Sequence, residues 1–201
     1  PPVALPDRRW PGNVISRAPA WLSTDLRDGN QALFEPMGPE RKLRMFRMLC
    51  EIGFREIEVA FPAASQTEFD FVRSLIEEGR IPEGVTIGAL TAAREPLIRR
   101  TVESLRGARR AIVHVYNSTS TLQRRVVFGL DRQGIVDIAV KRARRIRRNA
   151  AAMKETEVVY QYSPESFTGT ELDFAVEICE AVMDVWQPTP DRKVILNLPS
   201  T

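Results

Sequence analysis

The sequence predicts an α/β protein, a parallel TIM (β/α)8 barrel that is truncated after about its sixth strand. Short apolar runs alternate with amphipathic stretches at about 30 residues per unit, which is the rhythm of parallel βαβ crossovers. An open doubly wound sheet shares this rhythm, but LRDGNQ stands where its Gly-rich phosphate turn would follow the first strand. A complete barrel needs about 250 residues, and only about 180 follow the proline-rich start, so two strands and their helices are expected to be missing.

Residues 1–19 are predicted to form a Pro-rich N-terminal arm, and residues 20–201 a partial TIM-barrel catalytic domain. Proline fixes φ and lacks an amide donor, which disfavours both helix and central strand. We expect the arm to pack on the domain through Trp10, with Trp21 as a second candidate anchor. The prolines of the arm are Pro1, Pro2, Pro6, Pro11 and Pro19.

The strands are predicted from short runs that are rich in β-branched and aromatic residues. In order, these runs are Trp21 to Leu26, Arg55 to Ala60, Val85 to Leu90, Ala111 to Tyr116, Val158 to Tyr162 and Val194 to Leu198.

The helices between them are predicted from apolar residues that recur at helical spacing. Gly53 and Gly79 are expected to end the first two as C-terminal caps, and Pro188 to stop the last. The predicted helices start at Pro39, near Phe69, at Arg94, at Asp131 and at Leu172.

Composition argues for a soluble, reduced protein. The net charge of +3 is too small to imply a nucleic-acid or membrane partner. Cys50 and Cys179 each lie in an apolar helical pattern, so we expect reduced core thiols rather than a disulfide or metal pair. No run approaches the roughly 18 apolar residues of a membrane span, and the start lacks the apolar core of a signal peptide. We therefore expect a cytoplasmic location.

The first candidate site follows the first strand, where Asp25, Arg27 and Asp28 precede Gly29. Active sites of such barrels gather at the C-terminal ends of the strands. An arginine can bind a carboxylate through two hydrogen bonds, and a neighbouring aspartate can bind a divalent cation that the same ligand chelates. The alternative is a buried ion pair beside a polar turn.

Five separated motifs occur along the chain in the order STDLRDGNQALFEPM, EIEVAFPAASQTEFDFVR, HVYNSTSTLQRRVVFG, YSPESFTGTE and NLPST. Together they resemble 2-isopropylmalate synthases of the long form. The resemblance covers nearly the whole chain and implies a barrel of the pyruvate-carboxyltransferase and HMG-CoA-lyase type. It also implies condensation of acetyl-CoA with 3-methyl-2-oxobutanoate to 2-isopropylmalate and CoA in leucine biosynthesis, by a homodimer with a divalent cation, Mg²⁺, Mn²⁺ or Zn²⁺.

The resemblance gives roles to individual residues at these motifs. It makes Asp28 a metal ligand and Arg27 the group that polarises the oxo acid. Glu165 is a candidate for substrate positioning or the acid–base network, with a charge at a helix N-terminus as the alternative. The expected substrate contacts are His114, Ser163, Asn197, Thr201 and Glu58, although a lone histidine beside an apolar strand can be a satisfied core residue and Glu58 can simply pair with Arg27.

One part of the expected site is missing from this sequence. The family completes its metal site with a His-x-His pair in a later strand, whereas His114 is the only histidine here. We therefore expect these 201 residues alone to be inactive.

Three rival readings of the sequence are open. One is a related carboligase of the homocitrate or citramalate synthase type, and another is a non-catalytic assembly fragment. The third, a nucleic-acid-binding module, rests on the basic run from Lys141 to Arg148, although an apolar stripe through that run favours a packed helix with a basic solvent face.

Overall fold

The computed structural model describes residue 6 and residues 12–200. Trp10 and Thr201 therefore lie outside the described residues. Among those residues, six strands form one parallel sheet in the order in which they occur in the chain. They are β1 (Leu22–Ser23), β2 (Glu56–Ala60), β3 (Thr86–Ala92), β4 (Arg110–Ser118), β5 (Glu157–Glu165) and β6 (Val194–Leu196).

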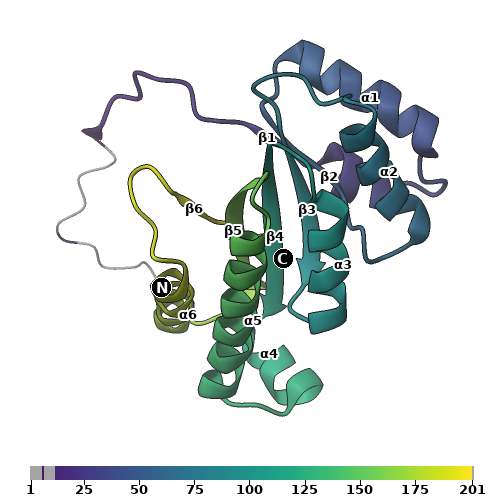
Figure 1. Cartoon of the computed structure of the whole chain (residues 1–201). Coiled ribbons are helices and arrows are strands. Elements are labelled where there is room, and N and C mark those ends of the chain that lie inside the picture. The colour runs from purple at the N-terminus through teal and green to yellow at the C-terminus, as the bar shows by residue number, and fades with distance from the viewer. Residues whose placement is uncertain (1–5, 7–11, 201) are drawn as a thin grey trace.

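The consecutive strand order confirms the truncated barrel over the open doubly wound sheet. In a doubly wound sheet the strand order reverses at a switch point, whereas in a barrel each strand pairs with the next in the chain. Here β1 and β6 are the two edges of the described sheet. Figure 1 shows the sheet as an open, curved wall with helices outside it, and Leu196 on the β6 edge is 37% exposed.

The helices cover one side of this wall in chain order. Contacts run from α2 to α3, from α3 to α5 and from α5 to α6, and Figure 1 shows α3 and α5 side by side against the strands. The helices are α1 (Pro39–Ile52), α2 (Gln66–Glu77), α3 (Glu95–Leu105), the single turn α4 (Thr121–Gln123), α5 (Arg132–Ala152) and α6 (Leu172–Trp186). Shorter turns are η2 (Asp25–Gly29), η3 (Arg124–Phe128) and η4 (Phe167–Gly169).

Local sequence signals account for the ends of several helices. Gly53 takes the left-handed conformation with φ of 110° and closes α1, as predicted. Ser65 and Asp131 cap α2 and α5 by accepting hydrogen bonds from the amides of Glu68 and Gly134. The helices therefore begin and end where capping chemistry places them.

Some details of the predicted chain are wrong: β5 extends to Glu165 rather than ending at Tyr162, and β6 ends at Leu196 rather than Leu198. The first strand ends at Ser23 rather than Leu26, because the Thr24 carbonyl accepts hydrogen bonds from the amides of Arg27, Asp28 and Gly29 and turns the chain into η2. Trp21 does not anchor the arm, since its side chain is 67% exposed.

The cysteine and basic-helix predictions agree with the structure. Cys50 is partly buried, Cys179 is buried, and both are free thiols, with burial raising the pKa of Cys179 to about 11. Helix α5 buries its apolar stripe against the sheet. From its basic face Arg142 binds Glu95 and the Ala93 carbonyl, so the run packs as a helix whose charges cover neighbouring elements.

Candidate functional site

A pocket of about 440 Å³ lies at the C-terminal ends of the strands, on the inner side of the half-barrel. This is where barrels of this kind place their active sites. Its lining comes from β1, β3, β4, β5, η2 and the segments that follow β1, η2, β2 and β6. The lining residues are Leu22, Thr24, Arg27, Asp28, Gln31, Phe61, Leu90, His114, Tyr116, Gln161, Ser163, Glu165, Asn197 and Pro199.

A continuous row of hydrogen bonds crosses the inner side of the sheet at this pocket. Arg27 Nε donates to Glu58 Oε1 at 2.5 Å, and His114 Nδ1 lies 2.5 Å from Glu58 Oε2. His114 Nε2 lies 2.7 Å from Ser163 Oγ, which also accepts from Asn197 Nδ2 at 2.7 Å. Five of the predicted site residues are thus joined side chain to side chain.

The strands position these groups because alternate residues of a strand point to the same face. Glu58, His114 and Ser163 come from β2, β4 and β5, so the Glu58 carboxylate has to reach across β3. Gly88 is the β3 residue in register with Glu58, and it has no side chain to block that path. A register shift between Glu58 and Ala60 follows directly, which is the kind of bulge that redirects a strand beside a site.

Electrostatics keep the Glu58 carboxylate ionised although only 1% of the residue is exposed. Burial raises the pKa of Glu58, but the hydrogen bond and charge of His114 and the guanidinium of Arg27 outweigh burial and leave the pKa below its usual range. An ionised carboxylate can only accept, so His114 Nδ1 carries a proton in either charge state of the ring.

Whether the other ring nitrogen, Nε2, donates or accepts a hydrogen bond therefore depends on the protonation of the ring. In neutral His114, Nε2 accepts from the Ser163 hydroxyl, and in the protonated ring it donates to it. Asn197 donates to Ser163 in both cases. The hydrogen bond between His114 Nε2 and Ser163 Oγ is therefore kept whichever of the two atoms carries the shared proton.

Arg27 and Asp28 stand at the open side of the pocket. Arg27 Nη1 lies 2.6 Å from Asp28 Oδ1, and the Asp28 side chain is 62% exposed against 14% for Arg27. Arg27 Nη2 takes part in neither this contact nor the one to Glu58. Asp25 does not line the pocket, and its carboxylate accepts from Ser23 Oγ.

Glu165 and Asn197 are fixed through their backbones. The Glu165 carbonyl accepts from the amide and hydroxyl of Thr119, and the next residue, Ser166, has a φ of 58° that turns the chain sharply. The Asn197 amide donates to the Tyr162 carbonyl. Glu165 thus lines the same pocket as the hydrogen-bonded row.

The described residues do not make a metal site by themselves. Across residue 6 and residues 12–200, no group of three or more His, Cys, Asp or Glu is placed to hold a metal ion. Both oxygens of Glu58 are already engaged by Arg27 and His114. The Asp28 carboxylate, in contrast, lines the pocket and pairs with Arg27 Nη1.

Several pocket residues escaped the sequence analysis. Tyr116 and Gln161 lie two residues from His114 and Ser163 on the same strands, so strand alternation could have found them. Gln161 is 4% exposed, and its Oε1 has no hydrogen-bond partner within the described part of the chain. The others are Leu22, Thr24, Gln31, Phe61, Leu90 and Pro199.

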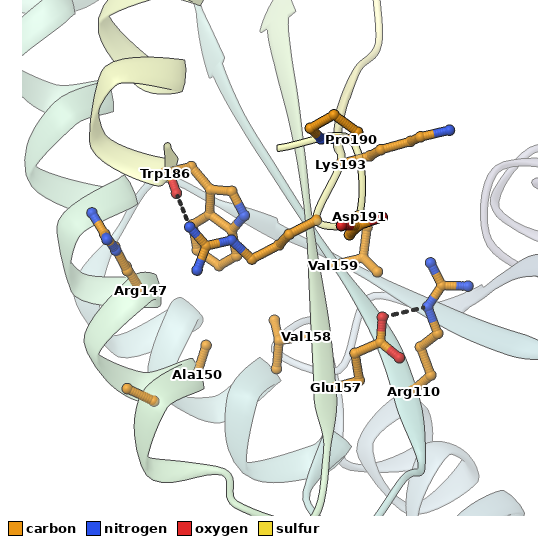
Figure 2. A pocket seen from close by; sticks show the side chains of 12 residues that line it. Arg110, Arg147, Ala150, Glu157, Val158, Val159, Trp186, Pro190, Asp191 and Lys193 are labelled. Carbon is orange, nitrogen blue, oxygen red and sulfur yellow. Dashed lines mark hydrogen bonds and ion pairs between the residues drawn. The ribbon is translucent and has the colours of Figure 1, made fainter. Parts of the chain in front are cut away.

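Two larger cavities, of about 650 and 780 Å³, lie beside α5 and α6. Figure 2 shows the first of them, at the opposite ends of the strands, with Arg110 and Glu157 joined across the starts of β4 and β5. Arg192 donates there to the Trp186 and Gln187 carbonyls. Arg192 thus caps the C-terminus of α6, and Arg110 is paired with Glu157.

Comparisons with known proteins agree with this geometry. The HMGL-like family model matches residues 18–201. A 2-isopropylmalate synthase of Ralstonia nicotianae is 67% identical over the whole chain, and one of Parafrankia sp. is 65% identical. The chain spans about 35% of the length of these relatives.

Solved structures support the fold. The hydroxymethylglutaryl-CoA lyase of Pseudomonas aeruginosa superposes with a TM-score of 0.63 at 18% identity, covering 90% of this chain and 57% of the lyase chain. A Bacillus subtilis HMG-CoA lyase gives a TM-score of 0.59 at 17% identity, covering 88% and 56%. The chain belongs to the HMGL-like family, and within it matches 2-isopropylmalate synthases along its full length.

Proposed function

We propose that the gene product containing this chain condenses acetyl-CoA with 3-methyl-2-oxobutanoate to 2-isopropylmalate and CoA, as part of leucine biosynthesis. The observation that carries the proposal is the hydrogen-bonded row from Arg27 to Asn197 in the pocket, in a chain 67% identical to a named 2-isopropylmalate synthase. The row supplies the donors that a 2-oxo acid needs.

The proposed role of Arg27 follows from its unused donor. A 2-oxo acid presents a carboxylate and a ketone oxygen, and a guanidinium can bind such planar oxygens through two hydrogen bonds. Arg27 is held by Glu58 and Asp28 through Nε and Nη1, so Nη2 can donate to the substrate without disturbing either contact. Preorganised donors of this kind stabilise the alkoxide that develops on the ketone oxygen.

The roles of His114, Ser163 and Asn197 follow from their order in the row. His114 and Ser163 share a proton position at the pocket, and Asn197 fixes the Ser163 oxygen. We assign these three to the substrate oxygens, and Leu90 and Phe61 to its branched side chain. Thr201 keeps its proposed substrate contact but lies outside the described residues.

The carbon–carbon bond is proposed to form in two proton-coupled steps. A base removes a methyl proton of acetyl-CoA, and the resulting enolate attacks the ketone carbon of the oxo acid. The alkoxide so formed takes up a proton from the acid–base network. Water then cleaves the thioester, which releases CoA. Glu165 lines the pocket and is the carboxylate that we place in this acid–base network.

Asp28 is the one residue to which we assign a role in binding a divalent cation. When bound, Mg²⁺, Mn²⁺ or Zn²⁺ would act as a Lewis acid on the oxo acid. The described residues do not complete its ligand set, so we propose that Asp28 contributes one ligand and that the 201 residues alone are inactive. Homodimer formation and a cytoplasmic location are likewise proposed. None of the helices in the described residues is long and apolar enough to cross a membrane.

The test is release of free CoA by the purified gene product, measured with a thiol reagent. Acetyl-CoA is supplied with 3-methyl-2-oxobutanoate, 2-oxoglutarate or pyruvate in parallel. We expect the highest kcat/KM with 3-methyl-2-oxobutanoate. Preference for 2-oxoglutarate or pyruvate would instead favour a homocitrate or citramalate synthase, and a lack of CoA release with all three would refute the proposed condensation.

A further inference from the structure

Lys42 lies in the first turn of α1, and its side chain is 1% exposed. Lysine is almost never buried to this extent unless it is paired. Its ammonium lies 2.8 Å from Glu68 Oε1 of α2 and 4.6 Å from the centre of the Phe71 ring. Burial lowers the pKa of Lys42, while the hydrogen bond and charge of Glu68 raise it. The net effect leaves the pKa of Lys42 below its ordinary value, and Glu68 is the anion that pairs with this buried side chain.

The second carboxylate oxygen of Glu68 contacts the segment that follows β2. Glu68 Oε2 accepts from the backbone amide of Phe61 at 3.2 Å, directly after β2 ends. In an ordinary capping box, a glutamate at this position of a helix reaches back to the amide of the N-cap residue, here Ser65. Here Ser65 Oγ accepts from the Glu68 amide, but the Glu68 carboxylate binds Lys42 and Phe61 instead.

Phe61 connects this arrangement to the site. It lines the same pocket as Arg27 and His114, and it follows by three residues the Glu58 carboxylate that holds both of them. No side chain other than that of Glu68 is seen to accept from the Phe61 amide among the described residues. The orientation of the chain at Phe61 thus depends on an acceptor that Lys42 holds in place.

We propose that Lys42 and Glu68 are positioning residues for the oxo-acid pocket, acting through Phe61. The identity of the substrate in this inference rests on the proposed function, whereas the contacts among Lys42, Glu68 and Phe61 do not depend on it. Lys42 fixes the Glu68 carboxylate, the carboxylate fixes the Phe61 amide, and Phe61 sets one wall of the pocket. Neither Lys42 nor Glu68 lines the pocket itself.

The competing explanation is that the pair only joins α1 to α2. An ion pair that merely joined two helices would change stability when broken, without moving the pocket. The two explanations differ at Glu68→Gln. A glutamine has one acceptor oxygen, so it can serve Lys42 or the Phe61 amide but not both.

The experiment compares Lys42→Met, Lys42→Arg and Glu68→Gln in the purified gene product. The matched controls are Glu77→Gln, an exposed carboxylate on the same helix, and Lys141→Met, an exposed lysine on α5. The first readout is exchange of the Phe61 amide hydrogen, measured by mass spectrometry in peptides that begin several residues before Phe61 and include it; Pro62 has no amide. The second is KM for 3-methyl-2-oxobutanoate against kcat.

We expect Lys42→Met and Glu68→Gln to speed exchange of the Phe61 amide about tenfold or more and to raise KM about tenfold, with kcat changed less than about twofold. In Lys42→Arg, Phe61 exchange and KM should both lie close to those of the unmodified protein. Glu77→Gln and Lys141→Met should change neither Phe61 exchange nor KM. If Lys42→Met fails to fold, Glu68→Gln decides alone. Unchanged Phe61 exchange in folded Glu68→Gln, or a lower melting temperature with unchanged KM, overturns the inference. If the unmodified protein turns over no oxo acid, the proposed function fails, and Phe61 exchange still decides whether the pair positions the chain.

Discussion

Replacing Glu58 by glutamine tests the hydrogen-bonded row at its centre. The carboxylate accepts from Arg27 Nε and from His114 Nδ1, each at 2.5 Å, in a residue that is 1% exposed. Glutamine keeps the shape but offers one acceptor oxygen, so one of the two donors then faces an NH₂ group. Glu58→Gln therefore removes at least one charge-assisted hydrogen bond from the site.

The size of the loss follows from these contacts. A hydrogen bond to a charged group contributes about 1.5–3 kcal/mol, and breaking a buried ion pair by removing one partner costs about 3–5 kcal/mol. Arg27 also pairs with Asp28, which keeps part of its charge compensated. We expect Glu58→Gln to lower the free energy of unfolding by about 3 kcal/mol.

Urea unfolding of the purified protein, followed by circular dichroism at pH 7, measures this difference. Glu77→Gln is the control, because that carboxylate is 62% exposed and pairs with Arg73 on the same helix face. The control should change stability by less than about 0.5 kcal/mol. If Glu58→Gln costs no more than the control, the Arg27–Glu58–His114 contacts do not form as described.

The remaining predictions concern pH, the pocket and the metal. Because the pKa of folded Glu58 lies below its ordinary value of 4.5, its stabilising effect should be complete above that pH and be lost as the pH falls through the folded value; the stability difference between the unmodified protein and Glu58→Gln, from urea unfolding at pH 7 to 3, should shrink accordingly, and a constant difference contradicts this. Ser163→Ala removes the partner of both His114 and Asn197, so KM for the oxo acid should rise about tenfold or more, and an unchanged KM in steady-state assays would exclude Ser163 from substrate binding. Gly88→Leu should disrupt the Glu58–His114 contact while Gly88→Ala fits, since a methyl group there meets Glu58 Cα at 3.5 Å and Ile112 Cβ at 3.6 Å; equal melting temperatures for the two variants would count against this path. The 201-residue chain should bind Mn²⁺ or Zn²⁺ only weakly by titration calorimetry, with little further loss in Asp28→Asn, and tight binding would mean that the described residues suffice as ligands.

The order of the strands and the location of the site were predictable because they depend on local patterns. Apolar runs at a regular spacing indicate parallel βαβ units, and polar residues at the ends of those runs have to meet at one edge of the sheet. Arg27 was found in this way, whereas His114 and Ser163 were assigned through the resemblance to 2-isopropylmalate synthases. The structure joins Arg27 to His114 through Glu58, and His114 directly to Ser163.

The connections between distant elements were not predictable from those patterns. Glu58 looked like a carboxylate that could merely pair with Arg27, because its second contact depends on Gly88 leaving β3 open. The Lys42–Glu68 contact could not be predicted from the helical pattern, because the two residues are 26 positions apart in the sequence. The early end of β1 was missed because it depends on three amides that converge on the Thr24 carbonyl.

The most direct test of the proposed site is a crystal structure of the gene product with 3-methyl-2-oxobutanoate. We expect the oxo acid to lie in the pocket at the C-terminal ends of the strands, with its oxygens within hydrogen-bonding distance of Arg27 and of His114 or Ser163. An oxo acid bound instead in the cavity beside Trp186 and Arg192, with the row from Arg27 to Asn197 left untouched, would contradict it.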